Sequence, residues 1–392
     1  MKARIPAGTS VRALFALIGV CVAAFSPFLA LLLRDRGFDA SQIGLVFSAM
    51  AATWMVANPV WGHVADMWIG RVPALGIAAL GAATMGLVFF LPERSMLVAL
   101  PVVILMAGFH GAVVPIGDAI ALDHLGTENV HDYGLIRLWS SLGFAVAAIA
   151  FGALSEVARI GLMPLIYAAA MATLAAWSAT MTREMPARVP TGGRFGSVGA
   201  AFRASSRLAP LLVGMLLWGI GFAAAWTFLP LRIVGRGGGP LLVGIAAAVG
   251  AFIEVPVMRK SKWFTRRFSL RGVYVLGCAI YASVFVAWAF IESPVVIAVL
   301  NVFEGVGFAL LYMSGVMVVG KLVPKHLRAT GQSVMQMVGQ GLGPVLGASI
   351  GGVVYGRFGP RALFIGAAAS TLLSAMVVWF TLAMPAFSER HD

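Results

Sequence analysis

Two charged residues lie inside apolar segments of this chain, where a helix that faces lipid would not carry them. Asp118 lies near the end of the segment 96–121, and Arg137 lies near the start of the segment 133–154. If both segments cross a membrane as helices, the chain turns back between them and places the two charges at a similar depth. A charge deep in a bilayer costs at least about 2.5–3.5 kcal/mol, so it usually faces a cavity or pairs with an opposite charge. The pattern predicts that Asp118 and Arg137 form a substrate or coupling site.

A structural role for the same two residues is the alternative. Both lie only about one helical turn inside a membrane boundary, and from there the long side chain of Arg137 can reach the interface. In that case the pair stabilises the helices without contacting a solute. The residue types and their spacing are compatible with both roles.

Three other titratable side chains lie within apolar segments. Glu304 lies nearest the middle of its segment, and Asn301 is on the same helical face by its i, i+3 spacing. A carboxyl at that depth is a candidate proton carrier, because its protonated form avoids the cost of a buried charge. Glu254 is a second candidate, although it can instead pair with Arg259 one turn later. His110, whose type ordinarily titrates near neutral pH, is either a coupling residue or a hydrogen-bonded residue of the core.

The segment 329–355 carries two stripes at i, i+4 spacing. One is polar and includes Gln332 and Gln336, which can line a cavity or bond to a neighbouring helix. The other consists of glycines, which let another helix approach closely. These glycines stand at positions 339, 343, 347 and 351.

The composition of the chain indicates a membrane protein. Of its 392 residues, 60% are hydrophobic and 11% are charged, and the mean hydropathy is +0.94. Soluble domains carry about 25% charged residues. Long apolar runs recur along the chain, and the first, near 12–33, is longer than the apolar core of a signal peptide. Cys21 and Cys278 lie within apolar segments and imply neither a disulfide framework nor a metal site.

The net charge of +13 reflects membrane topology rather than nucleic-acid binding. When alternate loops are counted from the N-terminus, one set holds 19 of the 28 Lys and Arg residues and the opposite set holds eight. Loops on the cytoplasmic side of a membrane carry such an excess of Lys and Arg. We therefore predict a multi-pass protein of the inner (cytoplasmic) membrane with both termini in the cytoplasm, and no nucleic-acid partner.

Apolar segments of about 20 residues predict twelve membrane helices. They lie near 12–33, 41–61, 72–92, 96–121, 133–154, 160–181, 208–232, 241–258, 271–291, 295–320, 329–355 and 361–384. Most connections are short, but Thr182–Arg207 is a basic segment rich in Pro, Gly and Ser that separates six spans from six. The predicted domains are an N-terminal bundle at 1–181, a cytoplasmic linker at 182–207 and a C-terminal bundle at 208–392.

The two halves also share a weak repeat. Phe28-Leu29, Arg36-Gly37 and Gly44 recur 200 positions later as Phe228-Leu229, Arg236-Gly237 and Gly244. A common offset on either side of a central linker favours two parallel six-helix repeats. We therefore expect an all-α membrane protein of two pseudo-symmetric six-helix bundles, with polar residues that line a cavity between them.

A spaced motif follows the second span. In NPVWGHVADMWIGR, the residues Gly62, Asp66, Gly70 and Arg71 have the spacing G-x-x-x-D-x-x-x-G-R. The glycines allow a tight turn and a close approach of helices, and the Asp and Arg can pair across helix ends. This motif resembles the signature loop between helices two and three of the major facilitator superfamily. The resemblance implies that Asp66, with Arg71 as partner, helps to latch the cytoplasmic side closed; otherwise these are ordinary loop charges.

The sequence around Asp118 and Arg137 narrows this resemblance. PIGD at 115–118 and YGLIRLWSSLGF at 133–144 resemble the P-x-x-[DE] and [FY]-G-x-x-R-[LM]-[WF]-G-x-[LIV]-G patterns of one proton-symporter branch. That branch contains lactose permease, nucleoside permeases and phenylpropionate permeases, and Ser140 here replaces its usual glycine. The resemblance covers nearly the whole chain and implies that Asp118 and Arg137 contact the solute.

One departure from that branch concerns proton coupling. Lactose permease carries a His and a Glu two and three turns after the acid that matches Glu304, where this chain has Tyr312 and Gly315. Proton coupling would then use Glu304, Asp118, Glu254 or His110. Lactose itself is not an expected substrate.

Two short motifs that suggest enzymes are excluded by their context. Gly347–Gly351 fits G-x-S-x-G, but it lies in a predicted membrane helix with no strand before it. Gly315–Lys321 fits G-x-x-x-x-G-K, but Leu322 stands where a Ser or Thr would bind magnesium. We therefore expect neither an enzyme nor an ATP-driven pump, and we expect no cofactor.

These observations predict a secondary transporter that uses the proton gradient to take up a small organic solute by alternating access. The solute classes are an aromatic acid, a nucleoside or a sugar-like compound, and the expected partners are that solute, protons and the lipid bilayer, with the chain as a monomer. Proton-driven efflux of sugars or amphiphilic compounds is the alternative, although the fifth span lacks the G-P-x-x-G run of proton antiporters. A membrane sensor or scaffold that transports nothing is a further alternative.

Overall fold

A computed structural model describes residues 7–91, 95–126, 132–181, 205, 207–324 and 327–381. Within these residues the regular elements are all helices, as the apolar segments predict. Ten helices are long and apolar enough to cross a membrane, and a shorter apolar helix covers Ser10–Ala23. The fold is thus an all-α, multi-pass arrangement, whereas the predicted number of twelve spans is not confirmed.

The chain divides into two compact units. Unit 1 comprises Met1–Thr191 and Ile233–Ala248, and unit 2 comprises Gly192–Arg232 and Val249–Asp392. The predicted linker at 182–207 lies almost wholly outside the described residues. The domain boundaries at 1–181 and 208–392 therefore stay predictions.

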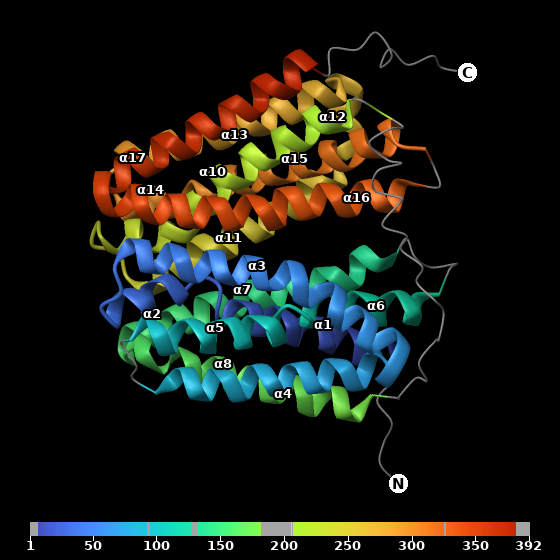
Figure 1. Ribbon diagram of the computed structural model, residues 1–392, viewed down its shortest axis with the longest axis vertical. Coiled ribbons are helices and arrows are strands. Elements are labelled where there is room, and N and C mark those ends of the chain that lie inside the picture. Colours follow the sequence, from blue (N-terminus) through green and yellow to red (C-terminus); the bar gives the residue numbers. More distant parts are fainter. Residues whose placement is uncertain are drawn as a thin grey trace. The chain divides into compact units, whose positions relative to one another are not determined.

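The described elements up to residue 180 belong to unit 1. They are α1 (Ala7–Ala23), α2 (Leu29–Asp35), α3 (Ala40–Val64), the π-helical turn η1 (Ala65–Ile69), α4 (Arg71–Phe90), α5 (Met96–His110), α6 (Val113–Leu125), α7 (Tyr133–Val157), the short η3 (Ile160–Leu162) and α8 (Met163–Thr180). Two pairs of packed helices form the core of this unit, α1 with α7 and α4 with α8 (Figure 1). α6 packs on both α1 and α4, so it contacts both pairs.

The remaining elements follow residue 207. They are α10 (Leu208–Val234), α11 (Pro240–Arg259), α12 (Ser261–Arg267), α13 (Leu270–Phe290), α14 (Pro294–Val299), α15 (Asn301–Leu322), α16 (Arg328–Gln336), the π-helical turn η5 (Met337–Leu342) and α17 (Gly343–Thr381). α13 packs on both α15 and α17 and is the centre of unit 2. Hydropathy does not predict α12, because its sequence SKWFTRR is polar and lies in a basic connection.

Two predicted spans contain breaks that hydropathy does not reveal. The span 96–121 consists of α5 and α6 with a turn at Gly111, where a Cβ would lie 2.6 Å from the Trp54 ring. Glycine at this turn therefore lets α3 approach closely. The span 12–33 consists of α1 and α2, and the turn between them contains Pro27, which has no N–H to donate to a helix.

The last two predicted spans, 329–355 and 361–384, lie in one helical run from Thr330 to Thr381. The run bends at Gly359, whose φ of 80° is a conformation that favours glycine. Counting continuous helices therefore gives one span where the hydropathy pattern gives two.

The weak repeat in the sequence corresponds to a repeated turn. Gly37 and Gly237 have φ of 89° and 85°, and each follows the end of a helix. In both turns the N–H after the glycine bonds back to a carbonyl oxygen of the last helical turn, at 3.1 Å and 3.0 Å. Such bonds satisfy carbonyl groups that a helix end leaves without partners. The halves thus share backbone geometry where they share sequence.

Arginines also bond the ends of equivalent helices in the two halves. Arg36 Nη2 donates to the carbonyl oxygen of Phe89 at 2.5 Å, and Arg232 Nη2 donates to that of Ala289 at 3.2 Å. The two carbonyl positions are 200 residues apart, at the ends of α4 and α13. A cation there offsets the partial negative charge of the helix C-terminus. Partial burial lowers the pKa of the Arg36 guanidinium, and the Asp35 carboxylate opposes this shift.

Glycines of η5 and α17 bring α10 into backbone contact. A Cβ on Gly347 would lie 2.3 Å from the carbonyl oxygen of Ile220, and a Cβ on Gly343 would lie 2.8 Å from the Cα of Gly219. The glycine stripe is therefore a packing face for another helix, as its spacing predicts. A side chain larger than hydrogen does not fit at this crossing without moving a backbone.

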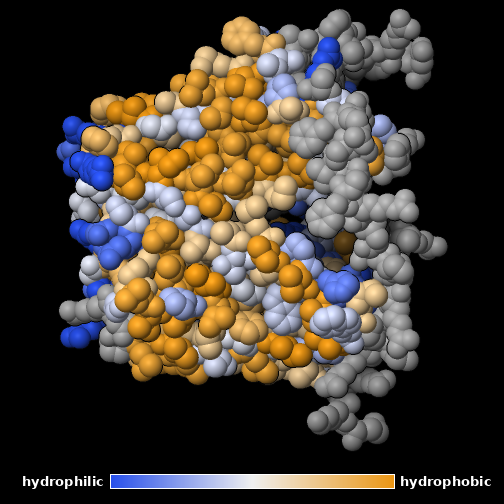
Figure 2. Space-filling view, in the orientation of Figure 1, coloured by the Kyte–Doolittle hydropathy of each residue, from blue (hydrophilic) through white to orange (hydrophobic). Residues whose placement is uncertain are grey.

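Large hydrophobic side chains cover much of the outside of the helices. In Figure 2 the hydrophobic colour extends over most of the visible face, and hydrophilic residues gather at the left edge, where helices end. Val157 and Leu97 are 92% and 87% exposed. Soluble monomers rarely expose apolar surface on this scale, so these side chains are suited to contact with lipid tails.

We expect Gly347→Val to lower the melting temperature of the detergent-purified protein, because the new side chain must displace the backbone of α10 or α17. Overpacking of this kind costs about 1–3 kcal/mol. Gly366→Val is the matched control, because Gly366 lies on the same helix and a Cβ there meets no described atom within 4 Å. Equal melting temperatures for the two variants would contradict the proposed role of the glycine stripe.

Candidate functional site

Asp118, on α6, binds two side chains of α7. Arg137 Nη1 lies 2.8 Å from Oδ1 and 3.1 Å from Oδ2 of Asp118. The Tyr133 hydroxyl donates to the same Oδ1 at 2.7 Å. The structure thus brings the two predicted charges together and adds a phenol to them. We refer to Asp118, Tyr133 and Arg137 as the Asp118 cluster.

Apolar packing between α1, α6 and α7 positions the Asp118 cluster. The buried members of this packing are Val11, Phe15, Ala121 and Ile136. Tyr133 packs against them, with its ring edge-on to the ring of Phe15 and the centroids 6.4 Å apart. Because Tyr133 and Arg137 are four residues apart, one face of α7 presents both of them to α6.

The Asp118 cluster is accessible. The side chain of Arg137 is 47% exposed and that of Asp118 is 32% exposed. Ion pairs this exposed contribute about 0–1 kcal/mol to stability, so the pair can rearrange at little cost. This geometry suits contact with a solute, and it is also compatible with purely structural pairing.

Arg71 connects the predicted gate motif to α6. Its Nε lies 2.9 Å from Asp66 Oδ1, and its Nη1 contacts Asp123 Oδ2. Asp66 lies in η1 and Arg71 begins α4, so this pair spans two helix ends. Asp123 is a partner that the spacing of the motif does not reveal, because it comes from α6, far away in the sequence.

The two glycines of the gate motif differ in what they do. Gly70 has a φ of 85° between η1 and α4, so the tight turn there favours glycine. A Cβ on Gly62 would meet no described atom within 4 Å. Close approach of a helix therefore does not explain the glycine at position 62.

α6 joins the gate motif to the Asp118 cluster. Its Asp123 binds Arg71 of α4, and its Asp118 binds Arg137 of α7. Arg71 Nη1 also lies 3.4 Å from the carbonyl oxygen of Ala119, the residue next to Asp118. A rotation or shift of α6 would therefore change both ion pairs at once.

Glu304 is a buried carboxyl on α15 of unit 2. It is 4% exposed, and the Tyr281 hydroxyl of α13 donates to its Oε1 at 2.8 Å. Its Oε2 faces α11, where a Cβ on Gly250 would lie 3.3 Å away. The absence of a side chain at Gly250 leaves room for the carboxyl.

Asn301 is fully buried one turn before Glu304. Its Nδ2 donates to the carbonyl oxygens of Ala298 and Ile297, at 3.1 Å and 3.4 Å. Its Oδ1 has no hydrogen-bond partner among the described residues. The side chain is thus fixed by its own helix and offers one unused acceptor.

Gln332 and Gln336, on α16, both bond to α15. Gln336 Nε2 donates to the hydroxyl oxygen of Tyr312 at 2.9 Å, and Gln332 Nε2 donates to the carbonyl oxygen of Val316 at 2.8 Å. Of the two possibilities for the polar stripe, the geometry shows bonding between helices. The exposed side chain of Gln336 is also accessible to a solute.

A row of aromatic rings lies in unit 2. Trp218, Phe222 and Trp226 follow one another along α10, with centroids 5.3 Å and 5.9 Å apart. Phe308 and Tyr312 stack on α15 at 5.4 Å, with an interplanar angle of 6°. The centroids of Trp218 and Phe308 are 6.0 Å apart, which joins the two stacks. We call these five residues the aromatic row, and Gln336 bonds to its end at Tyr312.

His110 lies at the end of α5 in an aromatic environment of unit 1. It is 7% exposed, and its Nδ1 is 3.1 Å from the Tyr167 hydroxyl. The rings of Phe25 and Trp54 lie 5.7 Å and 6.1 Å from the imidazole. These contacts fit the structural alternative for His110, a hydrogen-bonded residue of the core.

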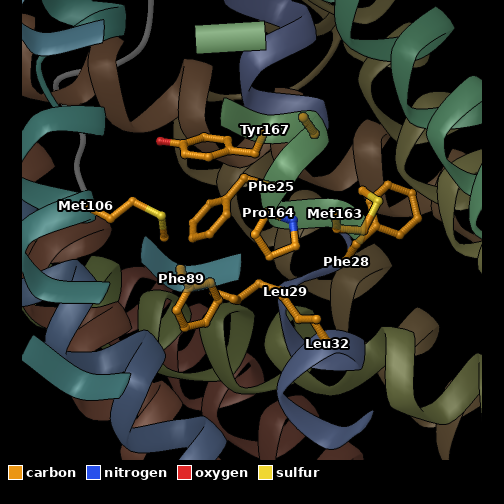
Figure 3. Close-up of a pocket in the computed structure, with 10 residues that line it drawn as sticks. Phe25, Phe28, Leu29, Leu32, Phe89, Met106, Met163, Pro164 and Tyr167 are labelled. Carbon is orange, nitrogen blue, oxygen red and sulfur yellow. The ribbon is translucent and has the colours of Figure 1, made fainter. Parts of the chain in front are cut away.

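The cavity beside Tyr167, the hydrogen-bond partner of His110, is too small for an organic solute. In Figure 3 the Tyr167 hydroxyl points to the side on which Met106 lies, away from Met163. The apolar cavity below the Tyr167 ring has a volume of about 10 Å³. That is the space of one water molecule at most, so this pocket is a packing defect rather than a solute site.

Comparison with known proteins decides the family. The sequence matches the MFS_1 like family over residues 13–366. The chain belongs to this family. It is therefore a membrane transporter of the major facilitator superfamily, as the loop motif predicts.

Two relatives match most of the transporter. Maltose permease of Geobacillus stearothermophilus is 28% identical over 370 residues, which cover 92% of this chain and 91% of the relative. Nucleoside permease NupG of Escherichia coli strain K12 is 23% identical over 340 residues, which cover 81% and 80%. The crystal structure of nucleoside transporter NupG matches with a TM-score of 0.85 at 17% identity, over 97% of this chain and all of the other. The predicted resemblance to a group that includes nucleoside permeases is confirmed.

The remaining predicted residues of the transporter are Glu254 and the two cysteines. Glu254 lies partly buried on α11, five residues before the helix ends at Arg259. Cys21 and Cys278 are both buried. In the part of the chain that the structure describes, no group of three His, Cys, Asp or Glu side chains could hold a metal ion.

We expect Tyr281→Phe to destabilise the transporter, because it removes the hydroxyl that bonds to a buried carboxyl. Leaving such a group unsatisfied costs about 1–3 kcal/mol. The cost should largely disappear in a Glu304→Leu background, which has no carboxyl to satisfy, when melting temperatures of the four proteins are compared in detergent.

Tyr274→Phe is the matched control for this cycle. Tyr274 lies on the same helix and its hydroxyl pairs with Ser374 at 2.8 Å, so the cost of losing it should be the same in both backgrounds. Additive effects of Tyr281→Phe and Glu304→Leu would show that the Tyr281–Glu304 bond does not matter for stability.

Proposed function

We propose that this transporter takes up a small sugar-like or nucleoside-like solute together with protons, by alternating access. The observation that carries the proposal is Glu304, a carboxyl that is 4% exposed and held by one phenol. Its proposed role is to carry the proton. The Asp118 cluster has the proposed role of binding the solute.

The proton role follows from the surroundings of Glu304. An ionised carboxylate among apolar helices needs charged or multiple hydrogen-bond partners, whereas a protonated one needs few. Among the described residues, Glu304 accepts a hydrogen bond from a neutral phenol, the hydroxyl of Tyr281. Binding of a proton therefore makes the buried state of this carboxyl cheaper, and loss of the proton favours a state in which water reaches it. Such a difference between two states is what couples a proton to alternating access.

The solute class follows from the residue types of both units. Carboxylate, guanidinium and phenol groups of the Asp118 cluster provide donors and acceptors for hydroxyl groups. Aromatic rings provide flat apolar surface for a sugar ring or a base. The names of the relatives, a maltose permease and a nucleoside permease, support these classes over an aromatic acid.

We infer the location and orientation of the chain in the membrane from its charge distribution. The excess of Lys and Arg in alternate loops supports a cytoplasmic membrane location with both termini in the cytoplasm. We propose that the chain works as a monomer and that the proton gradient is its only energy source.

Uptake into proteoliposomes tests the coupling. With a pH gradient that is alkaline inside, we expect labelled maltose or a labelled nucleoside to accumulate, and the accumulation to vanish with a protonophore. Glu304→Gln should abolish accumulation but preserve exchange of labelled for unlabelled solute, because an amide mimics the protonated carboxyl permanently.

Glu292→Gln is the control for this experiment, because Glu292 is a carboxyl of unit 2 whose side chain is 66% exposed. Accumulation driven by a gradient of the opposite direction would instead support efflux. No movement of any tested sugar, nucleoside or aromatic acid in either direction would favour a sensor or scaffold.

We expect Asp118→Asn and Arg137→Ala each to reduce uptake of the identified solute at least about tenfold, which corresponds to about 1.4 kcal/mol. Each change removes one partner of an accessible ion pair that the proposal places against the solute. Arg159→Ala is the matched control, because Arg159 is an exposed arginine at the other end of α7. If uptake by both cluster variants equalled that of the control, the Asp118 cluster would be structural only.

A further inference from the structure

A basic hollow lies at one end of unit 2, outside the proposed transport residues. Its volume is about 590 Å³. It is bounded by α12, the start of α13, the end of α15 and the start of α16. The charged residues among its described lining are Arg266, Arg267, Lys321 and Arg328, and none of the described lining residues is Asp or Glu. Three helices thus contribute cations to one hollow.

The backbone at the hollow adds to this positive potential. Ser269 and Leu270 line it where α13 begins, and Ser269 Oγ accepts a hydrogen bond from the N–H of Gly272 at 3.1 Å. The first turn of a helix carries N–H groups without partners in the helix and a partial positive charge. Guanidinium groups bind phosphate oxygens in pairs of parallel hydrogen bonds. The hollow therefore fits a phosphate group better than a single carboxylate.

Aromatic side chains at the hollow favour the head group of a phospholipid over a free phosphate ion. Phe268 lines the hollow and is 42% exposed, and Trp263, on the same short helix as Arg266, is 58% exposed. Exposed aromatic residues at the ends of membrane helices are typical of the interface between head groups and lipid tails. A free phosphate ion has no apolar part that could contact these rings, whereas the first acyl carbons of a phospholipid could.

We propose that this hollow binds the phosphate head group of an anionic phospholipid. Arg266, Arg267 and Arg328 contact the phosphate oxygens, and Phe268 contacts the acyl chain. Basic pockets between membrane helices bind such head groups. The excess of Lys and Arg in cytoplasmic loops explains why the connection between α11 and α13 is basic. It does not explain why α12, α15 and α16 surround a common hollow.

Lipid-dependent melting of the detergent-purified transporter tests this site. Dioctanoyl phosphatidylglycerol should raise the melting temperature in a saturable way, because a ligand that binds the folded state stabilises it. Arg266→Gln combined with Arg267→Gln should shift half-saturation to at least about tenfold higher lipid. Dioctanoyl phosphatidylcholine and inorganic phosphate should give no comparable rise at the same concentration.

The control is Arg259→Gln combined with Lys260→Gln, which removes two charges from the same basic connection at positions outside the hollow. This variant should keep the wild-type response. An equal loss in both double variants would reduce the effect to general charge attraction, and an equal rise with inorganic phosphate would replace the lipid with a free anion.

If the Gln variant does not fold, Arg266→Lys with Arg267→Lys decides the question: a wild-type response to lipid would overturn the proposed guanidinium contacts. Because melting is measured without transport, failure of the lipid site is distinguishable from failure of the transport proposal.

Discussion

The spans of this transporter depend on one constraint: lipid tails offer no hydrogen-bond partner to a polar group. Several of the described polar side chains meet it with partners inside the protein. Arg232 donates to three carbonyl oxygens near the end of α13, and Arg137 binds Asp118 across two helices. Asn301 Oδ1 is an exception among the described residues, and a buried acceptor without a partner costs about 1–3 kcal/mol. Asn301 lies one helical turn from Glu304, so two buried polar side chains are close together at the proposed proton site.

Close backbone packing is what keeps Glu304 out of contact with lipid and water. A Cβ on Gly305, its neighbour in the chain, would lie 2.4 Å from the carbonyl oxygen of Gly250. α11 and α15 therefore touch backbone to backbone beside the carboxyl, and α13 encloses it from another side through Tyr281. Unit 1 differs, because its ion pairs are partly exposed. Small residues thus create the buried site, and long polar residues create the accessible one.

Sequence patterns predicted those features that depend on local chemistry. Hydropathy located the helical segments, and the shared positions of Arg36-Gly37 and Arg236-Gly237 marked two turns with positive φ. The Asp118–Arg137 contact was predictable because a charge in an apolar segment needs a partner. Tyr281 and the aromatic row were not, because aromatic residues at helical spacing are equally typical of an apolar core. Asp123 was missed for a related reason: a carboxylate in a loop-like stretch is ordinary until the fold places it beside Arg71.

The two units suit two different tasks, and the difference is one of exposure. A solute must reach its binding groups, and the Asp118 side chain is 32% exposed. The oxygens of Asp118 accept hydrogen bonds from a phenol and a guanidinium, and hydroxyl groups can replace these donors. A coupling proton must be kept from leaking to water, and Glu304 is 4% exposed. Exchanging the two environments would defeat both tasks: an exposed carboxyl would equilibrate with either side freely, and a buried ion pair would resist rearrangement because separating its charges there is costly. α6 adds a third element, since its Asp118 and Asp123 link the proposed solute contact to the predicted gate motif through one helix. The proposed solute contact at Asp118 and the predicted latch at Arg71 are therefore both attached to α6.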